Sequence, residues 1–148
     1  MSGPVLQVSR TIAASPQAIF SVLADPAQHH VIDGSGYVGA PLRDSPERLA
    51  LGATFGMHMR FGVPYRIENS VVEFEEPTRI AWRHFGGHIW RYVLQSGDGG
   101  TLVTETFDAT TGRGGIFYAL LRVTHTHPPA MARTLERLDR LVTTGSPE

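Results

Sequence analysis

The chain has 148 residues, enough for a single domain over residues 1–148 that buries roughly 70% of its unfolded surface without help from a metal or a disulfide. Its net charge is −1 and its basic residues are spread singly, which excludes a surface that follows a nucleic-acid backbone. No apolar run approaches the roughly 20 residues of a membrane span, and the first residues do not read as a signal peptide. We therefore expect a cytoplasmic protein with no membrane insertion.

Two residue types are missing from the sequence. It contains no cysteine and no lysine, so all 13 basic residues are arginine. Their absence excludes thiolate nucleophiles, Schiff bases, cysteine-based zinc sites and a phosphate-loop lysine. Any chemistry must come from His, Asp, Glu, Tyr, Ser, Thr or Arg, and we expect no cofactor. The all-arginine set indicates a GC-rich coding genome and fits a bacterial source.

The first predicted elements are a strand and a helix with both ends marked. Apolar and polar residues alternate over residues 5–14, as in a strand with one buried face. Ser15 then caps a helix that starts at Pro16, where the missing donor costs nothing, and ends near Ala24. A second short helix is predicted over residues 26–32.

Most of the chain from there to residue 109 predicts strands joined by turns. In the third of these strands the apolar phase shifts between Ile67 and Val72, which predicts a β-bulge near Asn69-Ser70. The glycine-rich residues 96–100 predict a hairpin loop. The strands are predicted over residues 37–43, 55–61, 65–74, 79–85, 88–95 and 102–109.

The rest of the chain is predicted to be helical. Leucines recur at three-residue spacing from Leu135 to Leu141, and Gly145 ends the helix. Pro128-Pro129 interrupts the pattern, because each proline lacks a backbone donor and its ring clashes with the preceding turn. We therefore expect the helix to kink or restart near Thr126.

This order of elements resembles the START-like superfamily, also called SRPBCC or Bet v 1-like, and within it the small proteins of polyketide cyclase/dehydrase type. The resemblance covers essentially the whole chain and implies an α+β helix-grip fold. In that fold a curved, seven-stranded antiparallel sheet surrounds a long C-terminal helix, two short helices follow the first strand, and an apolar cavity lies between sheet and helix. The motifs that carry it are Ala14-Ser-Pro-x-x-Ile-Phe-x-Val-Leu-Ala-Asp-Pro26, Pro77-Thr-Arg-Ile-Ala-Trp82, Trp90-x-Tyr92, Thr101-x-Val-Thr-x-Thr-x-Asp108 and Leu135-x-x-Leu138-x-x-Leu141.

Apolar residues on the inward strand faces, with some from the closing helix, are the predicted lining of such a cavity. Pockets of this kind hold roughly 300–1,000 Å³, and burying about eight methylenes of a ligand contributes on the order of 6 kcal/mol before ordering costs. Plain core packing is the alternative for each residue. The predicted ligand-binding set is Phe55, Met57, Met59, Phe61, Trp82, His84, Trp90, Tyr92, Glu105, Phe107, Phe117 and Leu121.

Two polar residues of this set stand out because strand parity turns both of them inward. Glu105 beside His84 could orient a polar group of a ligand or act as a general base. In the alternatives a bulge turns Glu105 to solvent, or Glu105 pairs with Arg83 or Arg91. His84, Glu105 and Tyr92 are the candidate acid–base residues.

Other histidines and glycines predict no further chemistry. The pairs His29-His30 and His125-x-His127 lack the four-residue helical spacing that brings ligands to one metal ion, so we expect no metal site. The glycines of residues 34–36 and 97–100 form turns outside the context that phosphate binding requires. From the layout of the resembled family, Asp33-Gly34 is expected near Tyr37 at a cavity entrance.

The favoured function is the binding of a small, mostly apolar molecule, such as a lipid or an aromatic polyketide, for transport or sequestration. The alternative is a cofactor-independent cyclase or dehydratase that acts on an aromatic polyketide-like substrate. A third possibility is a protein-interaction or stress-response module with a filled cavity. Any of these is expected to be a monomer or a homodimer.

Overall fold

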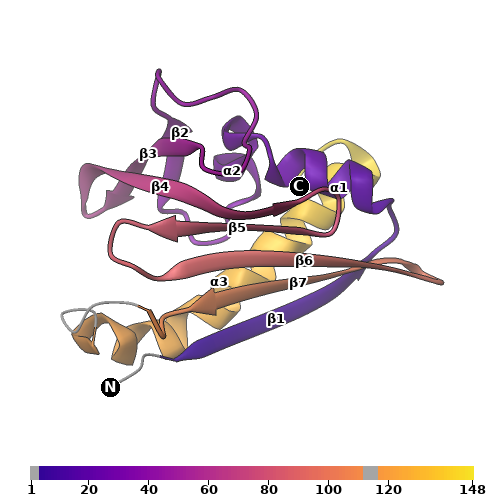
Figure 1. Cartoon of the computed structure of the whole chain (residues 1–148). Coiled ribbons are helices and arrows are strands. Elements are labelled where there is room, and N and C mark those ends of the chain that lie inside the picture. The colour runs from indigo at the N-terminus through magenta and orange to yellow at the C-terminus, as the bar shows by residue number, and fades with distance from the viewer. Residues whose placement is uncertain (1–3, 112–116) are drawn as a thin grey trace.

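The computed structural model describes residues 4–111 and 117–148, while the side chains of Phe61 and of residues 117–124 lie outside that description (Figure 1). Strands and helices fall close to the predicted ranges. The elements are β1 (Val5–Ile12), α1 (Pro16–Leu23), α2 (Pro26–Ile32), β2 (Val38–Pro41), β3 (Thr54–Phe61), β4 (Val63–Glu75), β5 (Arg79–His84), β6 (Ile89–Gly97), β7 (Gly100–Asp108) and α3 (Phe117–Thr144).

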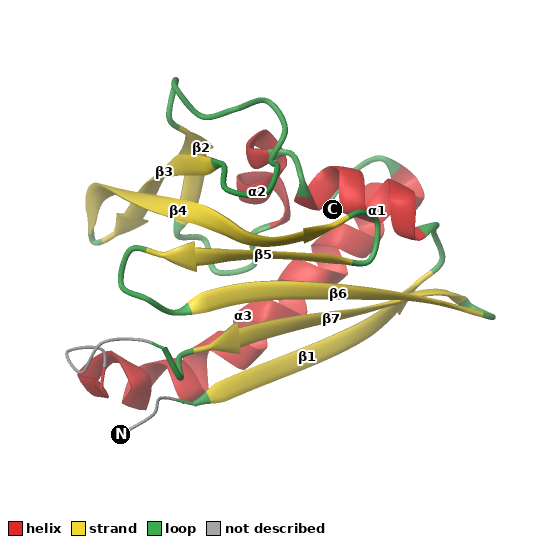
Figure 2. Ribbon diagram, in the orientation of Figure 1, coloured by secondary structure: helices red, strands yellow, loops and turns green. Residues whose placement is uncertain are grey.

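The seven strands form one antiparallel sheet in the order β1-β7-β6-β5-β4-β3-β2. The first strand thus pairs with the last one, and the remaining strands follow as a meander. The sheet curves, α3 crosses its concave face on a diagonal, and α1 and α2 cover one end (Figure 2). This is the predicted α+β helix-grip fold.

Both short helices begin as their sequences predict. The Ser15 hydroxyl accepts a hydrogen bond from the Ala18 amide at 3.1 Å, and the Asp25 carboxylate accepts one from the Ala27 amide at 3.0 Å. In each helix a proline follows the cap, at a position where the amide would have no helical partner. The caps fix where α1 and α2 close the end of the sheet.

Three local expectations need correction. The helix α3 runs unbroken through Pro128 and Pro129, so the predicted restart near Thr126 is wrong. Packing of its second half into the core outweighs the hydrogen bonds that the two prolines remove. The irregularity in β4 lies between Val71 and Glu73 rather than near Asn69-Ser70. The hairpin loop after β6 is shorter than predicted, since Gly97 and Gly100 already pair.

The main core lies between the concave face and α3. Leu135 and Leu138 of α3 pack into one cluster with apolar residues of the sheet and of α1. A smaller cluster joins Met131 of α3 to Phe107 and Ala109 at the far end of β7. The helix therefore holds the sheet at two separate places along its length.

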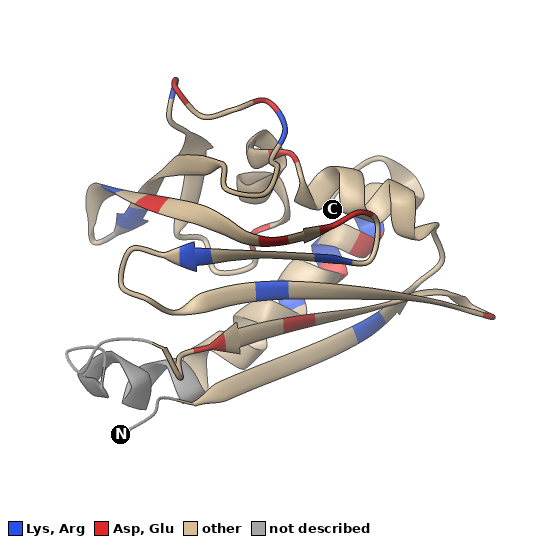
Figure 3. Cartoon of the chain, in the orientation of Figure 1, with Lys and Arg blue, Asp and Glu red and all other residues tan. Residues whose placement is uncertain are grey.

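Charged residues of both signs are distributed along the strands and the described part of α3 (Figure 3). On the convex face Arg91 contacts Glu73 through two hydrogen bonds, of 2.9 and 2.6 Å, and lies 3.9 Å from Asp108. Within residues 4–111 and 117–148, no helix combines the length and apolar character needed to cross a bilayer.

Candidate functional site

The register of β6 and β7 places a carboxyl group in the middle of the concave face. Tyr92 lies directly opposite Glu105, and Trp90 lies opposite Phe107. Directly opposed residues of an antiparallel pair share one face of the sheet, and residues two apart along a strand share it as well. All four side chains therefore face α3, with Val8 of β1 opposite Glu105 on its other side.

Glu105 and Tyr92 form a buried polar pair. Their exposed fractions are 3% and 5%, and the Tyr92 hydroxyl donates a hydrogen bond to the Glu105 carboxyl. The second carboxyl oxygen, Oε1, is buried without a partner. Burial raises the pKa of Glu105 to about 8, against the effect of the Tyr92 hydrogen bond, and burial beside Glu105 also raises the pKa of Tyr92.

A second carboxylate, Asp33, adds negative charge near this pair and raises both pKa values further. Its oxygens accept hydrogen bonds from the amides of Ser35, Gly36 and Val38 and from the Ser35 hydroxyl, at 2.7 to 3.2 Å. These bonds fix the position of the carboxylate at the end of α2.

Gly34 lets this segment approach α3 closely. A Cβ at this position would overlap the Ala130 carbonyl oxygen and the Arg133 side chain. The Gly34 amide donates to the Thr134 hydroxyl at 2.9 Å, and its carbonyl accepts from Arg133 at 3.0 Å. The glycine thus sets the distance between Asp33 and the helix that covers the site.

Aromatic rings surround the pair on the side of α1 and α2. His29 stacks on Trp82 with ring centroids 4.8 Å apart, and Phe55 meets both rings edge-on. Trp82 in turn lies 5.7 Å from the ring of Tyr92. The buried His29 donates from Nε2 to the Leu23 carbonyl at 2.8 Å, and burial lowers its pKa. These rings close one end of the concave face.

A second ring cluster lies at the other end and is only half-buried. Its members are His84, His88, Trp90, Phe107 and His127; all are half-buried except Phe107, which is buried. His127 of α3 stacks on Trp90 at 5.4 Å, and His84 stacks on His88 at 4.3 Å. Burial lowers the pKa of His84 and His127 and brings that of His88 to about 3. At neutral pH this cluster is an uncharged aromatic surface.

Among the residues that the structure describes, three buried side-chain atoms near the aromatic rings have no hydrogen-bond partner. Besides Glu105 Oε1, the side-chain atoms Asn69 Oδ1 and His88 Nδ1 are buried and make no hydrogen bond. Asn69 pairs with His84, next to His88. At about 3.3 Å per residue, His88 and Tyr92 lie roughly 13 Å apart along the strand direction. Buried polar atoms of this kind are usually satisfied by a ligand or by water.

The structure places most of the predicted site residues on the concave face. Phe55, Met57, Trp82, Tyr92, Glu105 and Phe107 are buried there, and Met59, His84 and Trp90 are half-buried. The predicted residues Phe61, Phe117 and Leu121 lie outside the described side chains.

The expected pairing of Glu105 with His84 is not observed. Tyr92 takes that place, because it lies directly opposite Glu105, whereas His84 lies in the half-buried cluster. Neither alternative for Glu105 is observed either, since the residue is buried and Arg91 contacts Glu73 on the convex face.

His88 and His127 are site residues that the sequence reasoning missed, and it assigned Asp33 only to a cavity entrance. The segment around Asp33 reads as a turn, and the two histidines precede a strand and two prolines. His88 has the inward parity of Trp90, a signal that could have placed it; the positions of Asp33 and His127 depend on how α2 and α3 pack.

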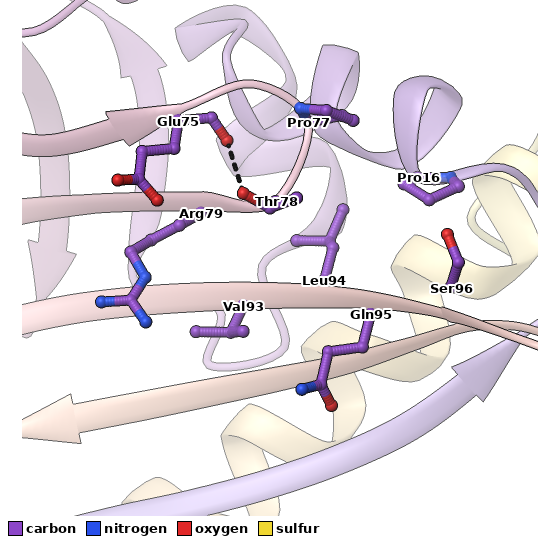
Figure 4. Close-up of a pocket in the computed structure, with 9 residues that line it drawn as sticks. All are labelled: Pro16, Glu75, Pro77, Thr78, Arg79, Val93, Leu94, Gln95 and Ser96. Carbon is purple, nitrogen blue, oxygen red and sulfur yellow. Dashed lines mark hydrogen bonds between the residues drawn. The ribbon is translucent and has the colours of Figure 1, made fainter.

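Two pockets lie elsewhere on the surface. One of about 400 Å³ is formed by the β4–β5 turn, β6 and the start of α1, and Figure 4 shows its lining side chains, including Leu94 and Pro77. The other, of about 570 Å³, lies between α2 and the loop after β2. Neither is lined by Glu105, Tyr92 or the ring clusters. Among the described residues, no group of three or more His, Asp or Glu side chains converges as a metal site.

The fold is that of a helix-grip domain, and the buried polar pair lies on its concave face. The sequence profile of the family described as polyketide cyclase/dehydrase and lipid transport matches residues 4–143. The chain belongs to this family.

The chain is also similar to a protein of Mycobacterium tuberculosis. The uncharacterized protein Rv0088 of Mycobacterium tuberculosis is 35% identical in an alignment of 140 residues that covers 89% of this chain and 62% of that protein. The chain therefore spans somewhat less than two thirds of the length of this relative.

Solved structures share the fold at low identity. Protein Ms6760 from Mycobacterium smegmatis has a TM-score of 0.74 at 19% identity, covering 95% of this chain and 92% of that one. The AHSA1-like protein from Aeromonas hydrophila has a TM-score of 0.68 at 20% identity, covering 98% and 96%. At this identity the likeness concerns the fold alone.

Proposed function

We propose that this protein binds a small, mostly apolar molecule, such as a lipid or an aromatic polyketide, between the concave face of its sheet and α3. The observation that carries the proposal is the buried Glu105–Tyr92 pair, whose carboxyl oxygen has no partner within an otherwise aromatic surface. A protein core gains nothing from such a group, because leaving a buried polar atom unsatisfied costs about 1–3 kcal/mol. A ligand that reaches it recovers that cost.

In this proposal the ligand enters beside the half-buried ring cluster. Trp90 and His127 stack across the interface between sheet and helix. Both side chains are partly exposed, so a ligand could reach them from solvent. An apolar ligand body would lie along Trp90 and Phe107, with its polar end toward Glu105. The membership of the chain in a family that includes lipid transport agrees with this role.

Native mass spectrometry of the purified protein, with a thermal-shift screen of lipids, flavonoids and aromatic polyketides, tests the proposal. A ligand at 100 times its Kd stabilises the fold by about 2.7 kcal/mol, which raises Tm by several degrees. Trp90→Leu on the concave face should weaken binding at least fivefold. Val93→Ala, on the opposite face of the same strand, is the control and should leave binding unchanged. No co-purified mass and no shift across the panel would contradict the proposal and favour a protein-interaction module.

A second candidate function is a cofactor-independent cyclase or dehydratase. The observation that favours it is the pKa of Glu105, about 8, because a general acid or base works best when its pKa is near the working pH. Incubation of the protein with a ligand found in the screen distinguishes the two functions. Loss of water or a new isomer that requires Glu105 indicates an enzyme, and an unchanged ligand indicates a binding protein.

A further inference from the structure

The charges around Glu105 select the kind of polar group that a ligand brings to it. We infer that the polar end of the ligand is an uncharged hydrogen-bond acceptor, such as a ketone carbonyl, which accepts from the free oxygen of the Glu105 carboxyl group, and that carboxylates and phosphates are excluded. This inference rests on the proposed function and gives its site a ligand class.

The hydrogen-bonding groups at the site are the Tyr92 hydroxyl and the Glu105 carboxyl. The Tyr92 hydroxyl is already directed at the Glu105 carboxyl, which leaves Oε1 as the atom free to meet a ligand. With a pKa of about 8, the carboxyl group is protonated at neutral pH and carries one hydrogen of its own. A carboxylic acid with one oxygen engaged by a donor therefore presents its hydroxyl to the interior.

The charge near Glu105 disfavours an anionic ligand. Asp33 is held near the pair by four hydrogen bonds, so a negative charge is already fixed beside the site. An anionic head group would add to that charge in a medium where it is poorly screened. An uncharged carbonyl has no such penalty.

No cation among the described residues acts on Glu105. Tyr92, from β6, and Asp33 are the groups whose charge or hydrogen bonding acts on Glu105. From β1, Arg10 faces the same side of the sheet but is 2.7 Å from Asp139. From α3, Arg133 and Arg137 donate to the carbonyls of Gly34 and Val31, while Met131 and Leu135 bring apolar side chains.

A pair of nearly isosteric probes separates the two classes of head group. Methyl naphthyl ketone and naphthoate differ by a methyl group in place of a charged oxygen, and the ketone does not titrate. Their Kd values are measured by displacement of the apolar dye N-phenylnaphthylamine. At pH 6.5 the ketone should bind at least tenfold more tightly than naphthoate. Above pH 8 its affinity should fall by about tenfold per pH unit as Glu105 ionises.

The isosteric variant Glu105→Gln tests whether the pH dependence comes from the ionisation of Glu105. Its amide donates at every pH, so its affinity for the ketone should stay constant between pH 6.5 and pH 9.5, whatever its absolute value. Equal or tighter binding of naphthoate, or the same pH profile in both proteins, would overturn the inference while leaving the proposed function intact. Failure of the dye itself to bind at pH 6.5 would overturn the proposed function and the inference together.

Discussion

A glutamate on the convex face of the sheet and one on the concave face have pKa values shifted in opposite directions. On the convex face Glu73 meets Arg91 through two hydrogen bonds, which are the main reason that its pKa is lowered. On the concave face Glu105 is hydrogen-bonded to Tyr92 and is affected by the charge of Asp33, and burial raises its pKa to about 8. Arg91 and Tyr92 are consecutive residues of β6, so a shift of one position along a strand separates a structural ion pair from a neutral acid.

The difference shows what each face contributes. A paired carboxylate at the surface supports the fold modestly and offers nothing to a ligand. A buried, neutral carboxyl group lowers stability at neutral pH, and such a cost is typical of binding and catalytic sites. The concave face is therefore the candidate functional face of the sheet.

The largest expected effect comes from Glu105→Gln. Because the folded pKa is raised above the ordinary value of 4.5, stability in the wild type is greatest below pH 4.5 and falls until about pH 8. In the variant the free energy of unfolding no longer falls with pH through the ionisation of Glu105. At pH 9 the variant should therefore be more stable than the wild type by as much as about 5 kcal/mol. Urea unfolding between pH 4 and pH 9 measures the difference, with Glu73→Gln as the control from the opposite face. Parallel profiles for the wild type and Glu105→Gln would mean that Glu105 is solvated.

A smaller effect is expected for Tyr92→Phe. Loss of the hydroxyl leaves a second carboxyl oxygen without a partner, which should cost about 1–3 kcal/mol at neutral pH. Since the Tyr92 hydrogen bond lowers the pKa of Glu105, its removal should move the ionisation of Glu105 to higher pH. A carboxyl-carbon NMR titration of Glu105 in both proteins measures this shift. An unchanged or lower pKa in the variant would rule out the Tyr92–Glu105 hydrogen bond.

The smallest effect is expected for Glu73→Gln. Its ion pairs lie at the partly exposed surface, so their loss should cost no more than about 1 kcal/mol. The contribution of Glu73 is present above pH 4.5 and is lost as the pH falls through its lowered pKa. Unfolding at low and high salt measures it, because salt screens an exposed pair. A loss of several kcal/mol, insensitive to salt, would mean that the two faces do not differ as described.

The sequence by itself determined the order and nature of the elements. The cap at Ser15, alternation along the strands and the leucine spacing near the C-terminus are local patterns, and each corresponds to an observed element. Strand parity also determined that Glu105 and Tyr92 face the same side as Trp90. These features depend only on neighbours in the chain, which is why they can be read without a structure.

Only the tertiary structure decided how those side chains combine. The register between β6 and β7 pairs Glu105 with Tyr92 instead of His84, and the packing of α2 brings Asp33 to them from a segment about 70 residues away in the chain. The helix α3 also continues through Pro128 and Pro129 because its leucines are buried against the sheet. Burial and long-range contacts set the charge of Glu105, and neither is encoded by spacing along the sequence.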